Sequence, residues 1–485
     1  MYPLSLLERL VAEPDAIAFE HGAAAISRRQ LVARVGAYQR LLRRTDVGPG
    51  VGVAIATAVT AEGFAAQLAA HSLGARVVGL GPSLTEAQLR HIVGDVSVVL
   101  ADAVRDTVEL RSAADARPVL AVSVDRPDAD LELIALGRPD DVAVVTFTSG
   151  STGTPKGVAT NYQAMSAHWA HAPDRWSDRT RELAAGYRRF ALFGTLASAV
   201  MQEHLALCLA SGGTAVIPDG IPVFPDLFEQ LRISACLLTV PRLHAVLDAL
   251  ADRPLDLSSL RSVLVAGSPL SPARLAQMFS VFGTAARQGY GQTETGMLTL
   301  LLPSDVAAYP DALNSVGRPM PGVDVEVRDG ELWVRSASQM CGYWQDPIET
   351  AEVLSDGWIR TRDLGRVTDD GFVELTGRAR DVVIVNAIVH YAGPIEQLLA
   401  QSADVDQAYL VGVPDERTGE AAHAFLVPAP GRRPDTRALS AAVADAFGAG
   451  AVPSSFVEIE VVPVGPSGKP DKRALAARAL ADHPS

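Results

Sequence analysis

Short apolar runs rich in β-branched residues alternate with helical segments through much of the chain. The pattern starts with VGVAI (51–55), which is followed by helical stretches at 60–73 and 85–94 and by further apolar runs. The alternation resumes at VAVVTF (142–147) and continues as far as SVLVAG (262–267). Strands that are apolar on both faces and separated by helices are typical of parallel sheets covered on both sides. We therefore predict an α/β fold built from parallel subdomains for most of the chain.

The sequence pattern changes after about residue 315. PGVDVEVRDGELWVRS alternates with period two around Asp329-Gly330, which predicts a β-hairpin, and two more short strands turn at 369–371. The last part restarts with VVIV and a helical segment, as expected for a small α+β domain. The short connection favours a hinge over a flexible tether. The predicted boundaries are a large unit at 1–376 with a β-rich subdomain at about 315–376, a hinge at 377–381, and a mobile C-terminal domain at 382–485.

Composition and charge exclude several classes of partner. With 48% hydrophobic and 20% charged residues, the chain of 485 residues has the composition of a globular protein. Its net charge of −14 argues against nucleic-acid binding, which needs an extended basic surface. The N-terminus MYPLSLLERLVAEPD does not resemble a signal peptide, and no apolar run is long enough for a membrane span. We expect a cytoplasmic protein without a nucleic-acid or membrane partner, as a monomer or homodimer.

Cysteine and histidine give no metal or disulfide signal. Cys208, Cys236 and Cys341 are too few and too scattered for a disulfide framework or a CxxC site, so we interpret them as buried thiols in a reducing compartment. His168 and His171 have a spacing that a metal site could use, but no third ligand accompanies them. We expect a core or surface role for both histidines.

The strongest local signal is TFTSGSTGTPKGV (146–158), directly after an apolar strand. Small residues leave backbone N–H groups unshielded, hydroxyls add donors and a lysine adds charge, so this loop predicts a phosphate cradle. The spacing is neither GxxxxGK[ST] nor GxGxxG, which excludes a P-loop NTPase and a dinucleotide site. Only three of the 42 basic residues are lysines: Lys156 in this loop, Lys469 in PSGKP, and Lys472, which has no evident role.

Six motifs in order carry a family resemblance. The loop is followed by QGYGQTETG (288–296), ELWVRSASQMCGYWQDPIETAEV (331–353), GWIRTRDLG (357–365), GRARD (377–381) and PSGKPDKR (466–473). Together they resemble the adenylate-forming superfamily of acyl-CoA synthetases, peptide-synthetase adenylation domains and luciferases. The resemblance covers nearly the whole chain and implies a two-step ligase whose small domain closes on the large one and then rotates.

The resemblance also assigns site residues. It implies that Glu294 holds Mg²⁺, that Thr293 contacts the α-phosphate, that Lys469 is the catalytic lysine, and that Arg380 is the hinge. It places Tyr290 beside adenine. It also implies that Asp363 accepts hydrogen bonds from both ribose hydroxyls, a natural task for two carboxylate oxygens. Arg362, directly before it, replaces the more frequent glycine of the family. The implied ATP-binding residues are Thr148, Ser149, Gly150, Ser151, Thr152, Gly153, Lys156, Gly289, Tyr290, Asp363 and Arg378.

Two places depart from the family pattern. Asn386-Ala387 replaces the usual Gly-Gly pair that lets a pantetheine arm approach, and added side chains narrow that approach. No aspartate lies between Arg188 and Gln202, where amino-acid-activating relatives have one, so an aryl or other apolar acid is favoured. The expected acyl-pocket residues are Phe190, Phe193, Gly267, Ser268 and Gly289.

The leading hypothesis is an ATP- and Mg²⁺-dependent ligase that forms an acyl-adenylate and pyrophosphate, then transfers the acyl group to CoA. An alternative sends the acyl group to an amine or another nitrogen nucleophile, which the loss of the Gly-Gly pair permits; a carrier-protein thiol is a further acceptor of the thiol class. The third hypothesis, of a different class, is a nucleotide-binding protein without turnover. The partners expected are therefore a small carboxylic acid and a second nucleophile.

Overall fold

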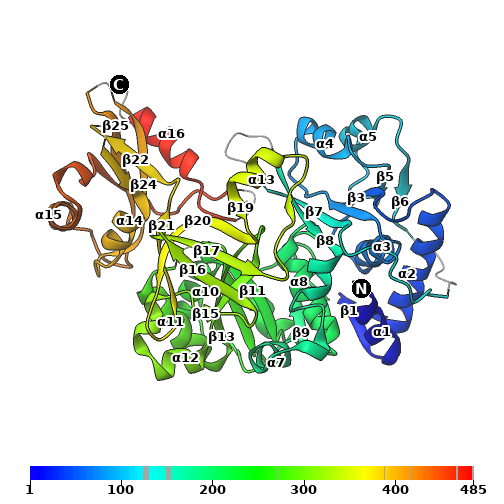
Figure 1. Cartoon of the computed structure of the whole chain (residues 1–485). Helices are drawn as coiled ribbons and strands as arrows, with labels where there is room; N and C mark the ends of the chain where they lie inside the picture. The colour runs from blue at the N-terminus through cyan, green and yellow to red at the C-terminus, as the bar shows by residue number, and fades with distance from the viewer. Residues whose placement is uncertain are drawn as a thin grey trace.

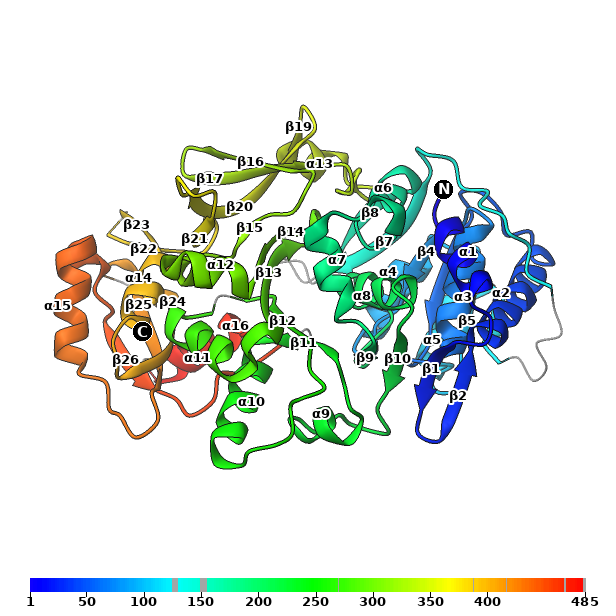
Figure 2. The same ribbon diagram turned by 90° about the horizontal axis from the view of Figure 1, so that it is seen from below.

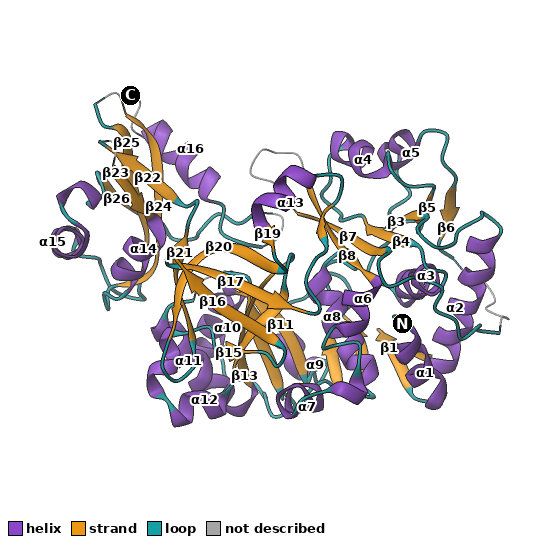
Figure 3. Ribbon diagram, viewed as in Figure 1, coloured by secondary structure: helices purple, strands orange, loops and turns teal. Residues whose placement is uncertain are grey.

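The computed structural model describes residues 1–123, 130–148, 155–268, 270–386, 388–415, 417–465 and 468–482. Figure 1 shows the chain running from an N-terminal α/β part through a second α/β part to a small unit at the opposite end, with a β-rich sheet between them. The predicted α/β fold with a β-rich subdomain and a small α+β unit is confirmed. Figure 3 shows helices and strands mixed throughout the large unit.

The first large sheet has seven strands in the order β18-β8-β7-β4-β3-β5-β6. β3, β4, β5, β6 and β7 are parallel, and every residue of β3 is buried, as its apolar run requires. β8 runs antiparallel to β7, because the two strands follow each other and are joined only by residues 149–155. The strands are β3 (Gly52–Ala56), β4 (Arg76–Gly79), β5 (Val98–Ala101), β6 (Val119–Ala121), β7 (Val142–Thr148), β8 (Lys156–Asn161) and β18 (Gly342–Tyr343).

The second large sheet has nine strands in the order β15-β14-β13-β12-β11-β9-β10-β1-β2. Its centre is parallel, while β14 returns antiparallel to β13 after a tight turn that contains Thr293 and Glu294. The strands are β1 (Ile17–His21), β2 (Ala24–Ser27), β9 (Arg189–Ala191), β10 (Thr214–Ile217), β11 (Ala235–Thr239), β12 (Ser262–Ala266), β13 (Ala286–Gln292), β14 (Gly296–Leu301) and β15 (Arg318–Pro319).

Helices fill the space between the two sheets and cover their outer faces (Figure 2). The largest core cluster joins α3 and α8 to inward residues of both sheets, such as Val53 and Phe190. Several helices start at side-chain caps: Thr60 accepts a hydrogen bond from Gly63 N at α3, and Thr85 forms a capping box with Gln88 at α4. These helices are α1 (Leu4–Ala12), α2 (Arg28–Arg43), α3 (Ala61–Ser72), α4 (Glu86–Val93), α5 (Val108–Ala114), α6 (Tyr162–Ala167), α7 (Asp178–Ala185), α8 (Ala199–Ala210), α9 (Asp226–Gln230), α10 (Val240–Asp252), α11 (Pro272–Phe282) and α12 (Pro303–Ala308).

The β-rich sheet has the order β16-β17-β20-β19, with β21 paired to β20. Its first hairpin turns at Asp329 and Gly330, whose φ values of 51° and 78° fit the two-residue turn that the Asp-Gly pair predicts. The elements are β16 (Val323–Arg328), β17 (Glu331–Ser336), α13 (Pro347–Val353), β19 (Leu354–Ser355), β20 (Trp358–Val367) and β21 (Val373–Arg378).

The C-terminal unit is a sheet in the order β23-β22-β25-β24, with β26 parallel to β25 and three helices against it. β21 ends at Arg378 and β22 begins at Val382, so the connection to the large unit is short. The elements are β22 (Val382–Val385), β23 (Ile388–Tyr391), α14 (Ala392–Ala400), β24 (Val405–Asp415), β25 (Gly419–Pro428), α15 (Thr436–Phe447), β26 (Ser455–Glu458) and α16 (Lys472–Asp482).

The cysteines differ in part from the expectation of buried thiols. Cys208 and Cys236 are buried, and burial raises the pKa of the Cys208 thiol to about 12. Cys341 is exposed, so the expectation was wrong for this residue, which stands directly before the short edge strand β18 rather than in an apolar run. Among the residues that the structure describes, no helix is both long and apolar enough to cross a membrane.

Three buried histidines make the fold sensitive to acid. Burial lowers the pKa of His71 and of His171 to about 3 and that of His204 to about 4. A histidine that is held neutral in the folded state binds fewer protons than in the unfolded chain, whose pKa is about 6.5. The contribution of such a histidine to the free energy of unfolding is therefore complete above pH 6.5. It is lost as the pH falls toward the pKa of the histidine in the folded state.

We expect the free energy of unfolding to fall by about 2 kcal/mol per buried histidine between pH 7 and pH 5. Chemical denaturation at the two pH values measures this change. The His171→Asn variant should lose about 2 kcal/mol of the pH dependence. An equal pH dependence in the wild type and in His171→Asn would contradict the assignment.

Candidate active site

Asp363 organises a polar cluster where the β-rich sheet meets the second large sheet. It lies on β20 and is 3% exposed. The Tyr290 hydroxyl and the Gln292 amide each donate to its Oδ2 at 2.6 Å, and Arg378 Nε donates to Oδ1 at 2.9 Å. Strand pairing explains the arrangement, because Asp363 and Arg378 are register partners between β20 and β21. Gln292 was missed by the sequence reasoning, although it stands in the QGYGQTET motif.

Glu294 lies in the turn after β13, next to Thr293. The Tyr343 hydroxyl donates to Glu294 Oε1 at 2.8 Å, and burial together with the Glu294 charge raises the pKa of Tyr343. Tyr343 belongs to β18, which pairs with β8 directly after Lys156. A strand from the β-rich part thereby links the Glu294 turn to the strand that carries Lys156.

Lys156 is held by an acidic partner from α13. Its Nζ lies 2.9 Å from Glu349 Oε1, and Arg362 Nη1 donates to the same oxygen at 2.7 Å. Burial acts to raise the pKa of Glu349, but the two cations outweigh it and lower the pKa to about 2. Lys156 also lines a cavity of about 290 Å³ together with Phe147. Because Glu349 already forms an ion pair with the Lys156 ammonium, any phosphate that binds Lys156 has to compete with this carboxylate.

Arg362 carries a side chain at a φ of 61°. Such a left-handed conformation favours glycine, so an arginine there needs fixing contacts. Arg362 Nη2 donates to Glu352 at 3.1 Å in addition to its bond to Glu349. Glu352 also lies 3.7 Å from Nη2 of Arg380, the predicted hinge residue.

Lys469 reaches the large unit from the C-terminal one. A Cβ placed on Gly267 would lie 3.6 Å from Lys469 Cε, and one on Gly468 would lie 3.3 Å from Thr239 Cγ2, so both glycines permit a close approach. Burial and the Arg378 charge lower the pKa of Lys469, while Glu294 and Asp363 act against this change. The ammonium is thus electrostatically coupled to the residues that the sequence assigned to ribose and Mg²⁺.

Lys472 has a structural explanation. Its Nζ forms ion pairs with Asp381, in the connection between the units, and with Glu396 of α14 at 2.5 Å. Glu396 also accepts a hydrogen bond from Leu410 N at 2.6 Å. Lys472 begins α16, so these bonds tie the helix that follows the Lys469 segment to the start of the C-terminal sheet.

The phosphate loop is described only at its ends. Thr148 and Lys156 are register partners at the ends of β7 and β8, and Thr148 Oγ1 donates to Lys156 O at 3.5 Å. The loop therefore begins and ends at one edge of the first sheet. The residues predicted to hold phosphate between them lie outside the described residues: Ser149, Gly150, Ser151, Thr152 and Gly153.

The predicted acyl-pocket residues differ in exposure. Phe193 is partly buried, with its ring 5.5 Å from that of Phe224, and Ser268 is half-buried. A Cβ on Gly289 would lie 3.4 Å from Leu264 Cδ1 and 3.5 Å from Met297 Sδ, so the surroundings of this glycine are apolar. Phe190 is fully buried in the core, 5.4 Å from the Tyr187 ring.

Other polar residues of interest lie apart from this cluster. His168 and His171 are buried, and His168 Nε2 lies 3.3 Å from Glu203 Oε1. The described part of the chain contains no group of three or more residues suited to holding a metal. Asn386 has a φ of 52° and its N–H donates to Thr418 O at 2.8 Å, while its neighbour Ala387 lies outside the described residues.

This architecture is that of an adenylate-forming ligase. It consists of two large sheets covered by helices, a β-rich sheet, and a small unit that brings a lysine to their junction. The chain belongs to the AMP-binding enzyme family, which matches residues 7–344, and the C-terminal domain of AMP-binding enzymes matches residues 394–469. The expected resemblance to the adenylate-forming superfamily is thus confirmed, and the protein is an ATP-dependent ligase of this class.

Known proteins of this family show different acceptors. A feruloyl-CoA synthase from Amycolatopsis sp is 30% identical over 96% of both chains. The amide bond synthetase McbA from Marinactinospora thermotolerans is 32% identical, with a TM-score of 0.83 over 98% of this chain and 99% of that one. ATP-bound MatB from Rhodopseudomonas palustris, at 22% identity and a TM-score of 0.81 over 99% of each chain, shares the fold.

Proposed function

We propose that the protein activates an aryl or other apolar carboxylic acid and transfers the acyl group to CoA. In the first step a carboxylate oxygen attacks the α-phosphorus of ATP, the bond to the β-phosphate breaks, and pyrophosphate leaves. In the second step a thiol adds to the acyl carbon, loses its proton, and AMP leaves. The position of Lys469 beside Gly267, coupled to Glu294 and Asp363, is the observation that supports the first step most directly.

Each site residue has a proposed task in adenylation. Asp363 accepts hydrogen bonds from the ribose hydroxyls, which would replace some of its present donors. Tyr290 packs beside adenine. Arg378 assists at the ribose or phosphates, and Lys156 exchanges Glu349 for phosphate oxygens. Lys469 neutralises the charge that develops between the acid and the α-phosphate, where positioned charge contributes most to phosphoryl chemistry.

A magnesium ion fits this site. Mg²⁺ is a hard cation that is typically bound by one or two carboxylates and by the phosphate oxygens of its nucleotide. Glu294 offers such a carboxylate, oriented by Tyr343 and next to Thr293, whose hydroxyl we assign to the α-phosphate. When bound, the ion would supply charge that offsets the phosphates, and Glu294 would hold it.

The residues near the acyl pocket support an apolar acid. Leu264 and Met297 surround Gly289, and the rings of Phe193 and Phe224 lie together. No carboxylate between Arg188 and Gln202 is present to pair with an α-ammonium group. The family member that is a feruloyl-CoA synthase supports hydroxycinnamic and related aryl acids as the first compounds to try.

An amine acceptor is the second candidate. It is favoured by Asn386-Ala387 in place of Gly-Gly, since Asn386 carries a side chain in a left-handed conformation where glycine would leave space for pantetheine. The amide bond synthetase at 32% identity points in the same direction. We also propose a carrier-protein thiol as a further acceptor of the thiol class. The protein is proposed to be a monomer or homodimer and to lie in the cytoplasm.

Pyrophosphate release across a panel of aryl, alkyl and α-amino acids tests the function. We expect release only with ATP and magnesium present, with aryl acids the best substrates. Mass spectrometry after addition of CoA, and separately of simple amines, then identifies the product as a thioester or an amide. ATP binding without pyrophosphate release from any acid would instead support a nucleotide-binding protein without turnover.

A further inference from the structure

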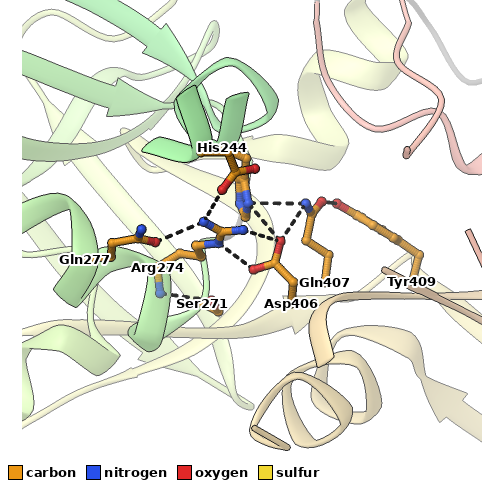
Figure 4. Close-up of polar contacts among 8 residues, drawn as sticks. His244, Ser271, Arg274, Gln277, Asp406, Gln407 and Tyr409 are labelled. Carbon is orange, nitrogen blue, oxygen red and sulfur yellow. Dashed lines mark hydrogen bonds and ion pairs between the residues drawn. The ribbon is translucent and has the colours of Figure 1, made fainter. Parts of the chain in front are cut away.

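A buried ion pair joins the large unit to the C-terminal unit (Figure 4). Arg274 of α11 donates from Nε to Asp406 Oδ1 at 2.5 Å and from Nη2 to Oδ2 at 3.0 Å, with Asp406 on β24 of the small unit. Nδ1 of His244, on α10, lies 3.1 Å from the same carboxylate. The side chains of Arg274 and Asp406 are each 9% exposed, so docking of the two units removes both charges from water.

Neighbours on both sides of the interface hold this pair in place. On the large unit, Arg274 Nη1 also donates to Asp248 at 2.8 Å and to Gln277 at 2.9 Å. On the small unit, Tyr409 donates to Gln407 at 2.7 Å, and the Gln407 amide lies 3.3 Å from His244 Nδ1. Figure 4 shows these side chains meeting between the two units. A fork of two parallel bonds fixes relative orientation as well as distance.

The first part of α10 lies beside both the Lys469 segment and the cluster around the ion pair, to which it contributes His244. Gly468 approaches Thr239, the residue directly before α10, and His244 lies in the following turn of α10. The docked orientation that forms the Arg274–Asp406 pair is therefore the one that places Lys469 beside Gly267. We therefore expect a rotation of the small unit that withdraws Lys469 to separate Arg274 from Asp406.

We propose that Arg274 and Asp406 are positioning residues that hold the small domain in the adenylating orientation and so favour the first half-reaction over acyl transfer. The inference rests on the two-step function proposed above. Breaking a buried pair by removing one partner is strongly unfavourable, because it leaves an uncompensated charge in the interface. The population ratio of two orientations of the small domain then depends exponentially on the free energy of the interaction that only one of them makes.

The pair stays charged under ordinary assay conditions. Burial acts to raise the pKa of Asp406, but the hydrogen bonds from His244 and Arg274 outweigh it and lower the pKa below its usual range. The carboxylate is therefore ionised throughout the neutral range. Substitution rather than a change of pH is the way to test its role.

The test measures the two half-reactions separately in Asp406→Asn. We expect kcat for acid-dependent pyrophosphate release to fall by about tenfold or more, a typical size for one coupling interaction. Acyl transfer from a supplied acyl-adenylate should stay equal to the wild type or become faster. AMP affinity should change by less than about twofold, because the adenine and ribose contacts proposed here lie on the large unit.

A matched control separates positioning from general loss of structure. Asp404→Asn removes a carboxylate that lies 3.9 Å from Arg432 within the small unit. This variant should keep the wild-type ratio of the two half-reactions. The double variant Arg274→Met/Asp406→Leu, which removes both buried charges of the pair, should recover part of the adenylation rate lost in Asp406→Asn.

An unchanged rate of pyrophosphate release in Asp406→Asn would overturn the proposal, and so would an equal fall in both half-reactions. These results differ from failure of the proposed function, in which the wild type itself would release no pyrophosphate with any acid. The adenylation measurement does not depend on the acceptor, so an amide product in place of a thioester leaves it intact.

Discussion

The Lys469→Ala variant is expected to release pyrophosphate at least about a hundredfold more slowly than the wild type, since loss of one positioned charge-stabilising donor typically costs two to three orders of magnitude. Lys469 is the lysine that the small domain brings to the junction, and its ammonium is coupled to Glu294, Asp363 and Arg378. Alanine removes the charge that would neutralise the attacking carboxylate and the α-phosphate. Steady-state pyrophosphate release under saturating ATP and acid measures the loss.

The distinguishing feature is that the loss should be confined to adenylation. ATP affinity measured by calorimetry should stay near the wild-type value, and acyl transfer from a supplied acyl-adenylate should be retained. Lys469→Arg is the matched control: it keeps the charge but not the compact ammonium, so it should recover only part of the rate. An alanine variant with wild-type turnover, or one that loses ATP binding in parallel, contradicts the assignment.

Several parallel strands of the large sheets could be predicted because their apolar runs stand out in the sequence, whereas the order of the strands in each sheet could not. VGVAI and SVLVAG are apolar on both faces and separated from their neighbours by capped helices, and they form β3 and β12 close to the expected positions. β23, β26 and α16 were missed. β23 and β26 are short, partly exposed strands, and only two residues of α16, Leu475 and Ala479, are buried, so the apolar pattern was too weak to find these elements.

The partners of the site residues could not be predicted, because they come from distant segments. Lys156 has the expected place after a buried strand, yet its ion pair with Glu349 forms only because β18 pairs with β8 and brings α13 alongside. Local motifs identify chemistry-bearing residues, whereas sheet pairing and domain docking decide what each of them contacts. The same reasoning applies to Arg274 and Asp406, which are 132 residues apart.

The Asp363→Ala variant is expected to lose about two orders of magnitude or more in kcat/KM for ATP, because each hydrogen bond to a charged group contributes about 1.5–3 kcal/mol. Asp363 is buried and gathers donors from Tyr290, Gln292 and Arg378, so its carboxylate is held in one orientation before any nucleotide binds. Such prior fixation is what lets two acceptor oxygens meet two ribose hydroxyls without further ordering. Kinetics with varied ATP at saturating acid measure the loss.

Nucleotide analogues distinguish a ribose contact from a structural role. The wild type should use 2′-deoxy-ATP at least about tenfold less efficiently than ATP, since one bond to the carboxylate is lost. In Asp363→Ala that discrimination should disappear, because the partner of the hydroxyl is already gone. Asp363→Asn keeps the shape but replaces one acceptor by a donor, so it should retain little of the discrimination. Equal discrimination between the two nucleotides in the wild type and in Asp363→Ala would show that the ribose is bound elsewhere and that Asp363 serves only to align Tyr290 and Arg378.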